Sequence, residues 1–159
     1  MRQIRIGYDL DGVIACWNEE DKETLKSTQP ESPAEHALYL NLMPNKDCLA
    51  KPVGTIITSR PSYLEGLTRQ WLKTHNITYQ KLFCIGDTQL YKSLCGQASN
   101  SEAEYQWGIS QAIEKSKIIK QERLLVYLED RKDVVDILTI SCPETLIMWY
   151  QSAKIERKA

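Results

Sequence analysis

Residues 4–13 read Ile-Arg-Ile-Gly-Tyr-Asp-Leu-Asp-Gly-Val, a short β-rich run that ends in an acidic turn. The run predicts a strand over residues 4–8, followed at once by the turn. Carboxylate oxygens are the hard ligands that Mg²⁺ prefers. Asp9 can offer one oxygen to a metal and direct the other at a phosphorus atom, while the main-chain carbonyl of Asp11 can be a second ligand. Gly12 allows the sharp turn that brings these groups together.

Further β-rich runs alternate with helical patterns along the rest of the chain. Strands are predicted at 55–58, 81–85 and 124–128, helices at 62–75, 102–121 and 132–138, and the start of a last short strand at 140–142. The continuous apolar run at 124–128 is typical of a strand buried on both faces. Alternating strands and helices imply right-handed crossovers and a mostly parallel sheet. We therefore expect an α/β, three-layer Rossmann-like fold, with residues 1–159 in a single domain.

Polar residues follow three of the predicted strands, at the point where each strand ends. Parallel sheets place their ligand sites at the carboxyl ends of the strands. Groups from three separate strands should therefore meet at one edge of the sheet: Asp9 and Asp11, Thr58 and Arg60, Glu129 and Asp130.

Two stretches fit the sheet poorly, residues 17–50 and residues 86–101. The first contains three prolines and a single short helical candidate at 34–42, and the second is polar and irregular. Both leave from the sheet edge where these polar groups meet, so they form either a lid over the site or solvated loops. The first insert is short for a full helical cap, so we expect a minimal cap, a thinly covered site and tolerance for more than one substrate.

Four stretches of the sequence resemble stretches that follow one another in the same order in the haloacid-dehalogenase-like phosphatases. Tyr8–Val13 resembles the first motif of that superfamily, and Ile56–Pro61 resembles the second, a strand ending in a Thr or Ser that binds phosphate. Val126–Asp130 resembles the fourth motif, an apolar strand closed by two acids. Between them, Thr68–Leu82 (TRQWLKTHNITYQKL) resembles the link found in the 5′-nucleotidase and polynucleotide-3′-phosphatase branches.

The resemblance implies a magnesium-dependent phosphatase with defined roles at the sheet edge. Asp9 is the implied nucleophile, which forms an aspartyl-phosphate, and Asp11 is the general acid and then the general base. Asp130 is implied to bind Mg²⁺, with Glu129 orienting a metal-bound water or making an outer contact. Thr58 is implied to hydrogen-bond the phosphoryl oxygens.

The third motif of the family is a lone lysine, for which Lys115, Lys117 and Lys120 are candidates. The helix that carries them should run antiparallel to the following strand, so its earlier residues lie nearer the catalytic edge. Lys115 is nine residues before Leu124, about 13 Å along a helix, and the strand climbs a similar distance. This geometry favours Lys115 over Lys117, and it places Lys120 near the opposite end.

Three further residues are assigned to substrate binding: Ser59, Arg60 and Trp17. Arg60 can contact a substrate phosphate, or it can pair with an acid of the core. Trp17 can stack on a base, or it can pack against the insert.

Composition narrows the choice of function. The chain has 20 basic and 21 acidic residues, a net charge of −1, which argues against a strong grip on long nucleic acid. Its five cysteines include no closely spaced pair, and no apolar run reaches membrane-spanning length, so we expect a cytosolic, soluble protein. The leading hypothesis is a phosphomonoesterase that acts on a nucleotide or another small phosphate ester. The alternatives are a 3′-phosphatase for nucleic-acid ends and a non-catalytic binding module; the oligomeric state is left open.

Overall fold

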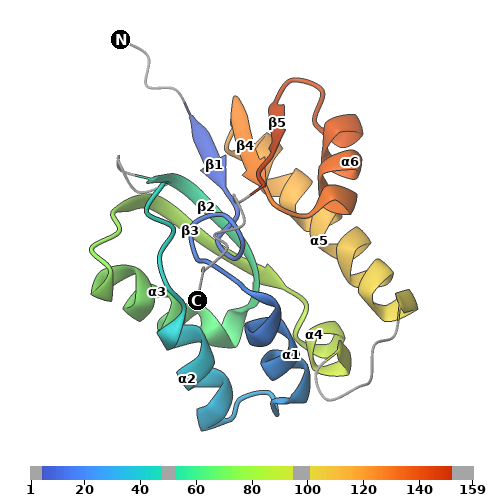
Figure 1. The fold of residues 1–159 in the computed structure, drawn as a ribbon. Helices are drawn as coiled ribbons and strands as arrows, with labels where there is room; N and C mark the ends of the chain where they lie inside the picture. Colours follow the sequence, from blue (N-terminus) through green and yellow to red (C-terminus); the bar gives the residue numbers. More distant parts are fainter. Residues whose placement is uncertain (1–4, 48–52, 95–100, 152–159) are drawn as a thin grey trace.

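The computed structural model describes residues 5–47, 53–94 and 101–151. Within these residues the chain forms an α/β fold around an all-parallel sheet of five strands, in the order β3-β2-β1-β4-β5 (Figure 1). This confirms the predicted fold class. The strands are β1 (Ile6–Tyr8), β2 (Val53–Pro61), β3 (Tyr79–Gly86), β4 (Val126–Glu129) and β5 (Leu146–Trp149).

The central strand β1 pairs with β2 on one side and with β4 on the other. The chain first adds β2 and β3 outward from β1, and then crosses back to add β4 and β5 on the opposite side. The strand order therefore reverses at β1. In open parallel sheets a ligand site lies at such a reversal, beyond the carboxyl ends of the strands.

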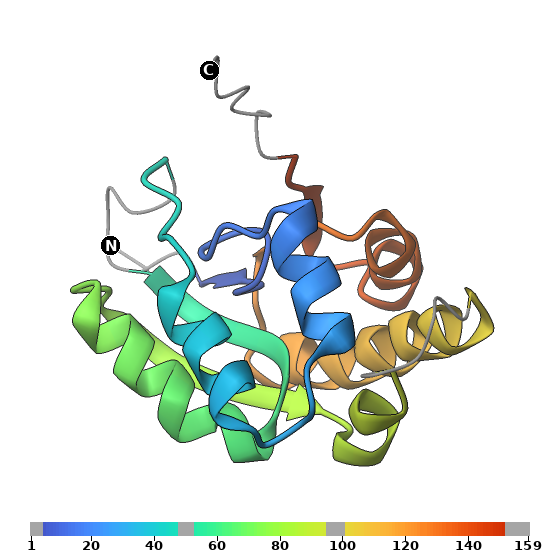
Figure 2. The ribbon, with the colours of Figure 1, turned by 60° about the horizontal axis from the view of Figure 1, so that its bottom comes forward.

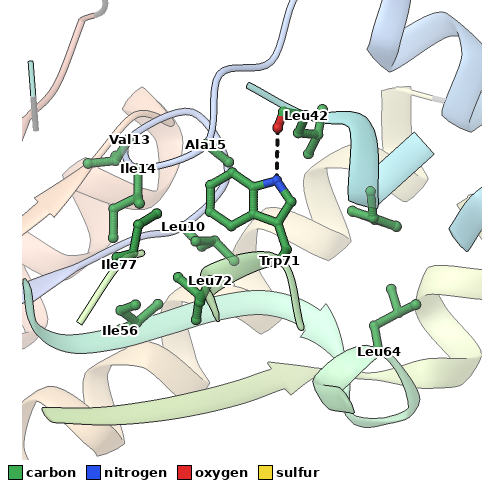
Figure 3. Close-up of a cluster of buried hydrophobic side chains, with 11 residues drawn as sticks. Leu10, Val13, Ile14, Ala15, Leu42, Ile56, Leu64, Trp71, Leu72 and Ile77 are labelled. Atoms are coloured by element: carbon green, nitrogen blue, oxygen red, sulfur yellow. Dashed lines mark hydrogen bonds between the residues drawn. The ribbon is translucent and has the colours of Figure 1, made fainter. Parts of the chain in front are cut away.

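One hydrophobic core lies between the sheet and the helices that follow β1 and β2. It is centred on Trp71, which is fully buried in α3 (Glu65–Thr74) and donates a hydrogen bond of 2.8 Å to the carbonyl of Leu42 (Figure 3). Leu10 and Ile56 pack in the same cluster. The bond to Leu42 ties α3 to the end of α2 (Pro33–Asn41), so the insert between β1 and β2 is anchored in this core.

A second core lies on the opposite face of the sheet. Ile57, the neighbour of Ile56 in β2, packs there with Tyr127 and with residues of α5 (Ser101–Gln121) and α6 (Lys132–Ser141). Successive strand residues point to opposite faces, so adjacent isoleucines supply the two cores. The molecule thus has three layers, as predicted.

The insert between β1 and β2 contains two helices, α1 (Glu19–Ser27) and α2, whereas we predicted only the second. Helix α1 has no buried residue, so it lacks the apolar periodicity that reveals a helix in a sequence. A capping box starts it: the side chain of Asn18 accepts from the amide of Asp21, and that of Asp21 accepts from the amide of Asn18.

Three other predictions about elements need correction. Residues 88–94, expected to be irregular, form α4 (Thr88–Leu94), and the side chain of Asp87 accepts a bond from the amide of Leu90. The last strand is not at 140–142, because α6 continues to Ser141 with Leu138 and Cys142 buried one turn apart. It begins at residue 146 instead. Leu125, expected inside, is 48% exposed.

The remaining elements lie at their predicted places but differ at their ends. Strand β1 begins at Ile6 and not earlier, β2 extends beyond 55–58 at both ends, and β4 begins at Val126 and not at Leu124. Ile4, predicted in the first strand, lies outside the described residues. The predicted helix at 62–75 is a short 3₁₀ turn, η1 (Ser62–Leu64), that runs into α3. Asn76 follows α3 with a positive φ of 55°, a conformation that commonly ends a helix. None of the described helices combines the length and the apolar character required to cross a membrane.

Candidate functional site

The site lies where β1 and β4 end side by side. β1 runs into Asp9, whose amide donates a 2.8 Å hydrogen bond to the carbonyl of Leu128 in β4. β4 ends one residue later, at Glu129, and Asp130 follows. Parallel pairing in this register brings acidic residues that are far apart in the chain to one edge of the sheet.

Three carboxylates gather at this edge. One oxygen each from Asp9, Glu129 and Asp130 lies within 4.8 Å of the others, an arrangement that can hold a metal ion. Asp9 and Glu129 are buried and Asp130 is half-buried. The ammonium of Lys115, fully buried in α5, donates to Glu129 Oε2 at 2.6 Å and lies 3.2 Å from Asp9 Oδ1.

Burial and mutual repulsion perturb the acids of this cluster. Burial, reinforced by the charge of Glu129, raises the pKa of Asp9 well above its usual range and that of Asp130 to about 7. Burial alone would lower the pKa of Lys115, but the charges of Asp9 and Glu129 outweigh it and raise that pKa, so the lysine stays charged. One ammonium thus faces three neighbouring carboxyl groups, whose burial and mutual repulsion oppose the charged form.

The donor set fits a hard divalent cation. All three side chains offer oxygen, the ligand type preferred by Mg²⁺, and a bound cation would relieve the repulsion among them. The residues that would hold Mg²⁺ are Asp9 and Asp130, with Glu129 beside them and shared with Lys115.

Gly12 lets the turn after β1 pass close to this cluster. Its φ is +89°, and a Cβ added there would lie 2.0 Å from Asp130 Oδ2. The turn is closed by backbone bonds from the amides of Ile14 and Ala15 to the carbonyl of Leu10. Only a residue without a side chain leaves room for the Asp130 carboxylate at this place.

Asp11 does not join the acid cluster through its side chain. The guanidinium of Arg60 forms a bidentate pair (a fork) with the Asp11 carboxylate: Nε donates to Oδ2 at 2.9 Å, and Nη2 donates to Oδ1 at 2.6 Å. The indole of Trp17 donates to the same Oδ1 at 2.7 Å, and the hydroxyl of Thr58 lies 3.5 Å from Oδ2. Of the two roles considered for Arg60, pairing with an acid is the contact present in this structure.

Arg60 is itself held by buried groups from the insert and from α3. Burial would lower the pKa of Arg60, but Asp11 more than compensates and raises it. The guanidinium lies 4.4 Å from the ring centre of Tyr39 in α2, and its Nη1 donates to Thr68. The Tyr39 hydroxyl is in turn 2.9 Å from that of Tyr91 in α4. Sequence patterns did not single out either tyrosine.

Ser59, also assigned to the substrate, contacts a residue that the sequence reading missed. Its hydroxyl donates to the side chain of Gln111 in α5, which is 4% exposed. A signal was present in the spacing: Gln111 lies four residues before Lys115, so both occupy one face of the helix. The other lysines of α5 face away, since Lys117 is exposed and pairs with Glu114, and Lys120 is exposed as well.

A pocket of about 460 Å³ opens from the acids toward solvent. Its inner end is lined by Asp9, Asp11 and Asp130, and its walls include residues of the helices α1, α4 and α5. Figure 2 shows how these three helices are arranged. Trp17 and Arg60 line it as well, so both remain within reach of a ligand. The edge of Trp17 packs on Tyr39 of the insert, 5.6 Å between ring centres, while the pocket lies beside it.

Comparison with known proteins adds a likeness of fold. No protein-family model matches the chain, and no curated protein matches its sequence. A chain in a solved structure described as the Pnkp1/Rnl/Hen1 RNA repair complex superposes on 94% of this protein with a TM-score of 0.58 and 13% sequence identity. This protein covers 43% of that chain. At this identity, the match supports the α/β fold described above and says nothing by itself about activity.

Proposed function

We propose that this protein is a magnesium-dependent phosphomonoester hydrolase that works through an aspartyl-phosphate at Asp9. The observation that carries the proposal is the position of Asp9. It belongs to a three-carboxylate cluster that suits Mg²⁺, and it lines the inner end of a pocket together with a second aspartate, Asp11. When bound, Mg²⁺ would neutralise negative charge on the transferring phosphoryl group.

The two oxygens of Asp9 have different surroundings. Oδ1 accepts the amide of Leu10 at 2.8 Å and lies 3.2 Å from the ammonium of Lys115. Oδ2 is therefore the oxygen proposed to attack phosphorus. In the first step a bond forms between Oδ2 and phosphorus, and the bond from phosphorus to the ester oxygen breaks. In the second step the oxygen of a water molecule bonds to phosphorus, and the Asp9 carboxylate is released with inorganic phosphate.

Asp11 is proposed to move the protons of both steps. It gives a proton to the departing ester oxygen, and it takes one from the attacking water. Arg60 and Trp17 donate hydrogen bonds to its carboxylate oxygens, so Asp11 must turn one oxygen away from Arg60 to carry the proton.

The other assigned residues are proposed to position the phosphoryl group. Thr58 is fully buried and lies between Asp11 and the amide of Arg60, which donates to its hydroxyl at 3.2 Å. Lys115 is proposed to keep Asp9 oriented and to offset charge, and Ser59 to bind an ester oxygen. The proposal includes a single domain, in which α1 and α2 serve as a small cap, and a cytosolic location.

The test is release of inorganic phosphate from p-nitrophenyl phosphate with and without Mg²⁺, for the natural protein and for Asp9→Asn. We expect turnover that requires Mg²⁺ and falls at least about 10³-fold in the variant. The matched control is Asp136→Asn, an exposed aspartate of α6 that pairs with Lys132; it should keep full activity. Turnover that persists in Asp9→Asn would contradict the proposal. A folded protein that binds Mg²⁺ and hydrolyses no ester would favour the non-catalytic alternative.

A second candidate is hydrolysis of a phosphate at the end of a nucleic-acid strand. Two observations favour it: the likeness in fold to a chain of an RNA repair complex, and three basic residues that line the pocket in addition to Arg60. These are Lys22, Lys26 and Arg131. Hydrolysis of a terminally phosphorylated oligonucleotide, compared with p-nitrophenyl phosphate, would reveal this activity.

A further inference from the structure

One face of α5 runs from the acid cluster out along the pocket. Lys115, Gln111, Trp107 and Ala103 follow one another at intervals of four residues, so each lies about 6 Å further along the helix axis. Lys115 is inside the acid cluster, and the other three line the pocket. The helix therefore presents a charge, then a polar amide, then a flat apolar ring, in that order from the phosphoryl position outward.

The polar side chain of this helix face, Gln111, is held in one position. Gln111 is 4% exposed and accepts a hydrogen bond from the hydroxyl of Ser59, which lies on the adjacent strand β2. An amide and a hydroxyl at this position suit a leaving group that carries hydroxyl or ether oxygens next to the phosphate.

The aromatic side chain of this helix face, Trp107, is also held in position by its neighbours. The ring of Trp107 packs against that of Tyr91, with 5.9 Å between the centres. The indole of Trp17 is held by its bond to Asp11. Leu25 of α1 and Leu94 of α4 add apolar surface to the pocket lining. Rigid aromatic and aliphatic walls of this kind suit a flat, weakly polar ring.

The outer part of the pocket is lined by ion pairs. Lys22 and Lys26 on α1 and Arg131 after β4 line the pocket, and they pair with Glu19, Glu23 and Asp133 respectively. Lys26 also lies 3.8 Å from Glu104 and so joins α1 to α5.

We propose that the pocket selects a phosphorylated nucleoside, with its sugar beside Gln111 and Ser59 and its base against Trp107. This inference rests on the proposed function for the reacting end and adds the class of leaving group. An aryl phosphate such as phosphotyrosine joins its ring directly to the ester oxygen, so the ring would lie beside the amide, about 6 Å short of the indole. An alkyl phosphate would leave the aromatic walls unused.

The test compares substrates that differ by one part. Ribose 5-phosphate and adenosine 5′-monophosphate differ only by the base, and phosphotyrosine has a ring without a sugar. We expect kcat/KM for the nucleotide to exceed that for ribose 5-phosphate by about 10-fold or more, as base stacking on an aromatic side chain provides. A ratio near one, or equal hydrolysis of phosphotyrosine, would overturn the inference.

Variants of α5 make the assignment residue by residue. Trp107→Ala should reduce the nucleotide-to-ribose phosphate ratio to below about 2, while Trp107→Phe keeps most of it. Tyr105→Ala, on the same helix but 57% exposed and away from the pocket, is the matched control and should keep the ratio. Gln111→Leu should lower kcat/KM for both sugar phosphates more than for p-nitrophenyl phosphate. An unchanged ratio in a folded Trp107→Ala protein would refute the base site.

Two further experiments answer separate questions. The first distinguishes a free nucleotide from the end of a nucleic-acid strand, and the second tests the pocket even if the proposed function fails. A short single strand with a terminal phosphate that outperforms the mononucleotide would assign the pocket to a strand end, and the opposite order would assign it to free nucleotides. If no ester is hydrolysed at all, the proposed function fails, but the pocket is still tested by calorimetry on Asp9→Asn. Adenosine monophosphate should then bind about 10-fold more tightly than ribose 5-phosphate; equal affinity would overturn the inference.

Discussion

Replacing Gly12 by alanine would put a methyl group where the carboxylate of Asp130 now lies. The added Cβ falls 2.0 Å from Asp130 Oδ2 and 2.3 Å from Asp130 Cγ, whereas ordinary contacts of this kind begin at 3.4 Å. The difference for Oδ2, 3.4 minus 2.0, means that the carboxylate must retreat by more than 1 Å. The substitution therefore changes the geometry of the site that would hold Mg²⁺, although no ligand residue is replaced.

The size of the effect follows from two separate costs. The positive φ of 89° disfavours any residue with a side chain, by about 1–2 kcal/mol. For a chain of 159 residues, each kcal/mol lowers the melting temperature by about 2–4 °C. Mg²⁺ needs its oxygens at about 2.0–2.1 Å in near-octahedral geometry. A displaced Asp130 should therefore weaken Mg²⁺ binding by about 10- to 100-fold, as disturbed support of a metal ligand commonly does.

Calorimetric titration with Mg²⁺ measures the second cost, and thermal unfolding in EDTA measures the first. Gly66→Ala is the matched control, since Gly66 lies exposed in α3 with no atom within 4 Å of an added Cβ. It should leave Mg²⁺ binding unchanged and stabilise the helix by up to about 1 kcal/mol. If folded Gly12→Ala binds Mg²⁺ within about twofold of the natural protein, the placement of Asp130 beside the turn, or its role as a ligand, is refuted.

Three further outcomes are expected. Lys115→Met leaves buried carboxylates without their ammonium and should lower the free energy of unfolding by about 3–5 kcal/mol, whereas Lys117→Met, at an exposed site, should change it by less than about 0.5 kcal/mol; equal effects in urea unfolding would contradict the burial described here. Arg60→Lys keeps the charge but loses the fork on Asp11, so kcat for p-nitrophenyl phosphate should fall about 10-fold or more, and unchanged kcat would show that the fork does not position Asp11. Burial raises the pKa of Cys84 to about 11, so about one thiol in a thousand is ionised at pH 8. Alkylation of Cys84 by iodoacetamide, followed by peptide mass mapping, should therefore be slow at pH 8 and accelerate up to pH 10. Rapid labelling of Cys84 at pH 8 would contradict the raised pKa.

The existence of the main strands and the acids at their ends could be predicted because both depend on local patterns. A β-rich run that closes in Asp9, Asp11 and Gly12 has one direction along the chain, and parallel pairing then brings the ends of β1 and β4 to one edge. The same reasoning placed Lys115 ahead of Lys117, since helix and strand have known rises per residue.

Elements without an apolar signature were missed or misplaced. Helix α1 buries none of its residues, so only its capping box at Asn18 and Asp21 could have announced it. Helix α6 was cut short, because residues 140–142 have β-branched and apolar character although Leu138 and Cys142 continue a helical face. Local propensity was overridden there by packing against α5.

The partners of the site residues were decided by tertiary structure. Sequence alone left Arg60 between a substrate phosphate and a core acid, and the choice of Asp11 depends on how the turn after β1 lies against the end of β2. The contact between Ser59 and Gln111 joins residues 52 positions apart, and the depth of Trp107 in the pocket depends on where α5 crosses the sheet. The sequence by itself determined which chemical groups reach the sheet edge, because strand ends are local features. The folded chain decided how those groups pair, because distances between separate elements are set by packing across the whole core.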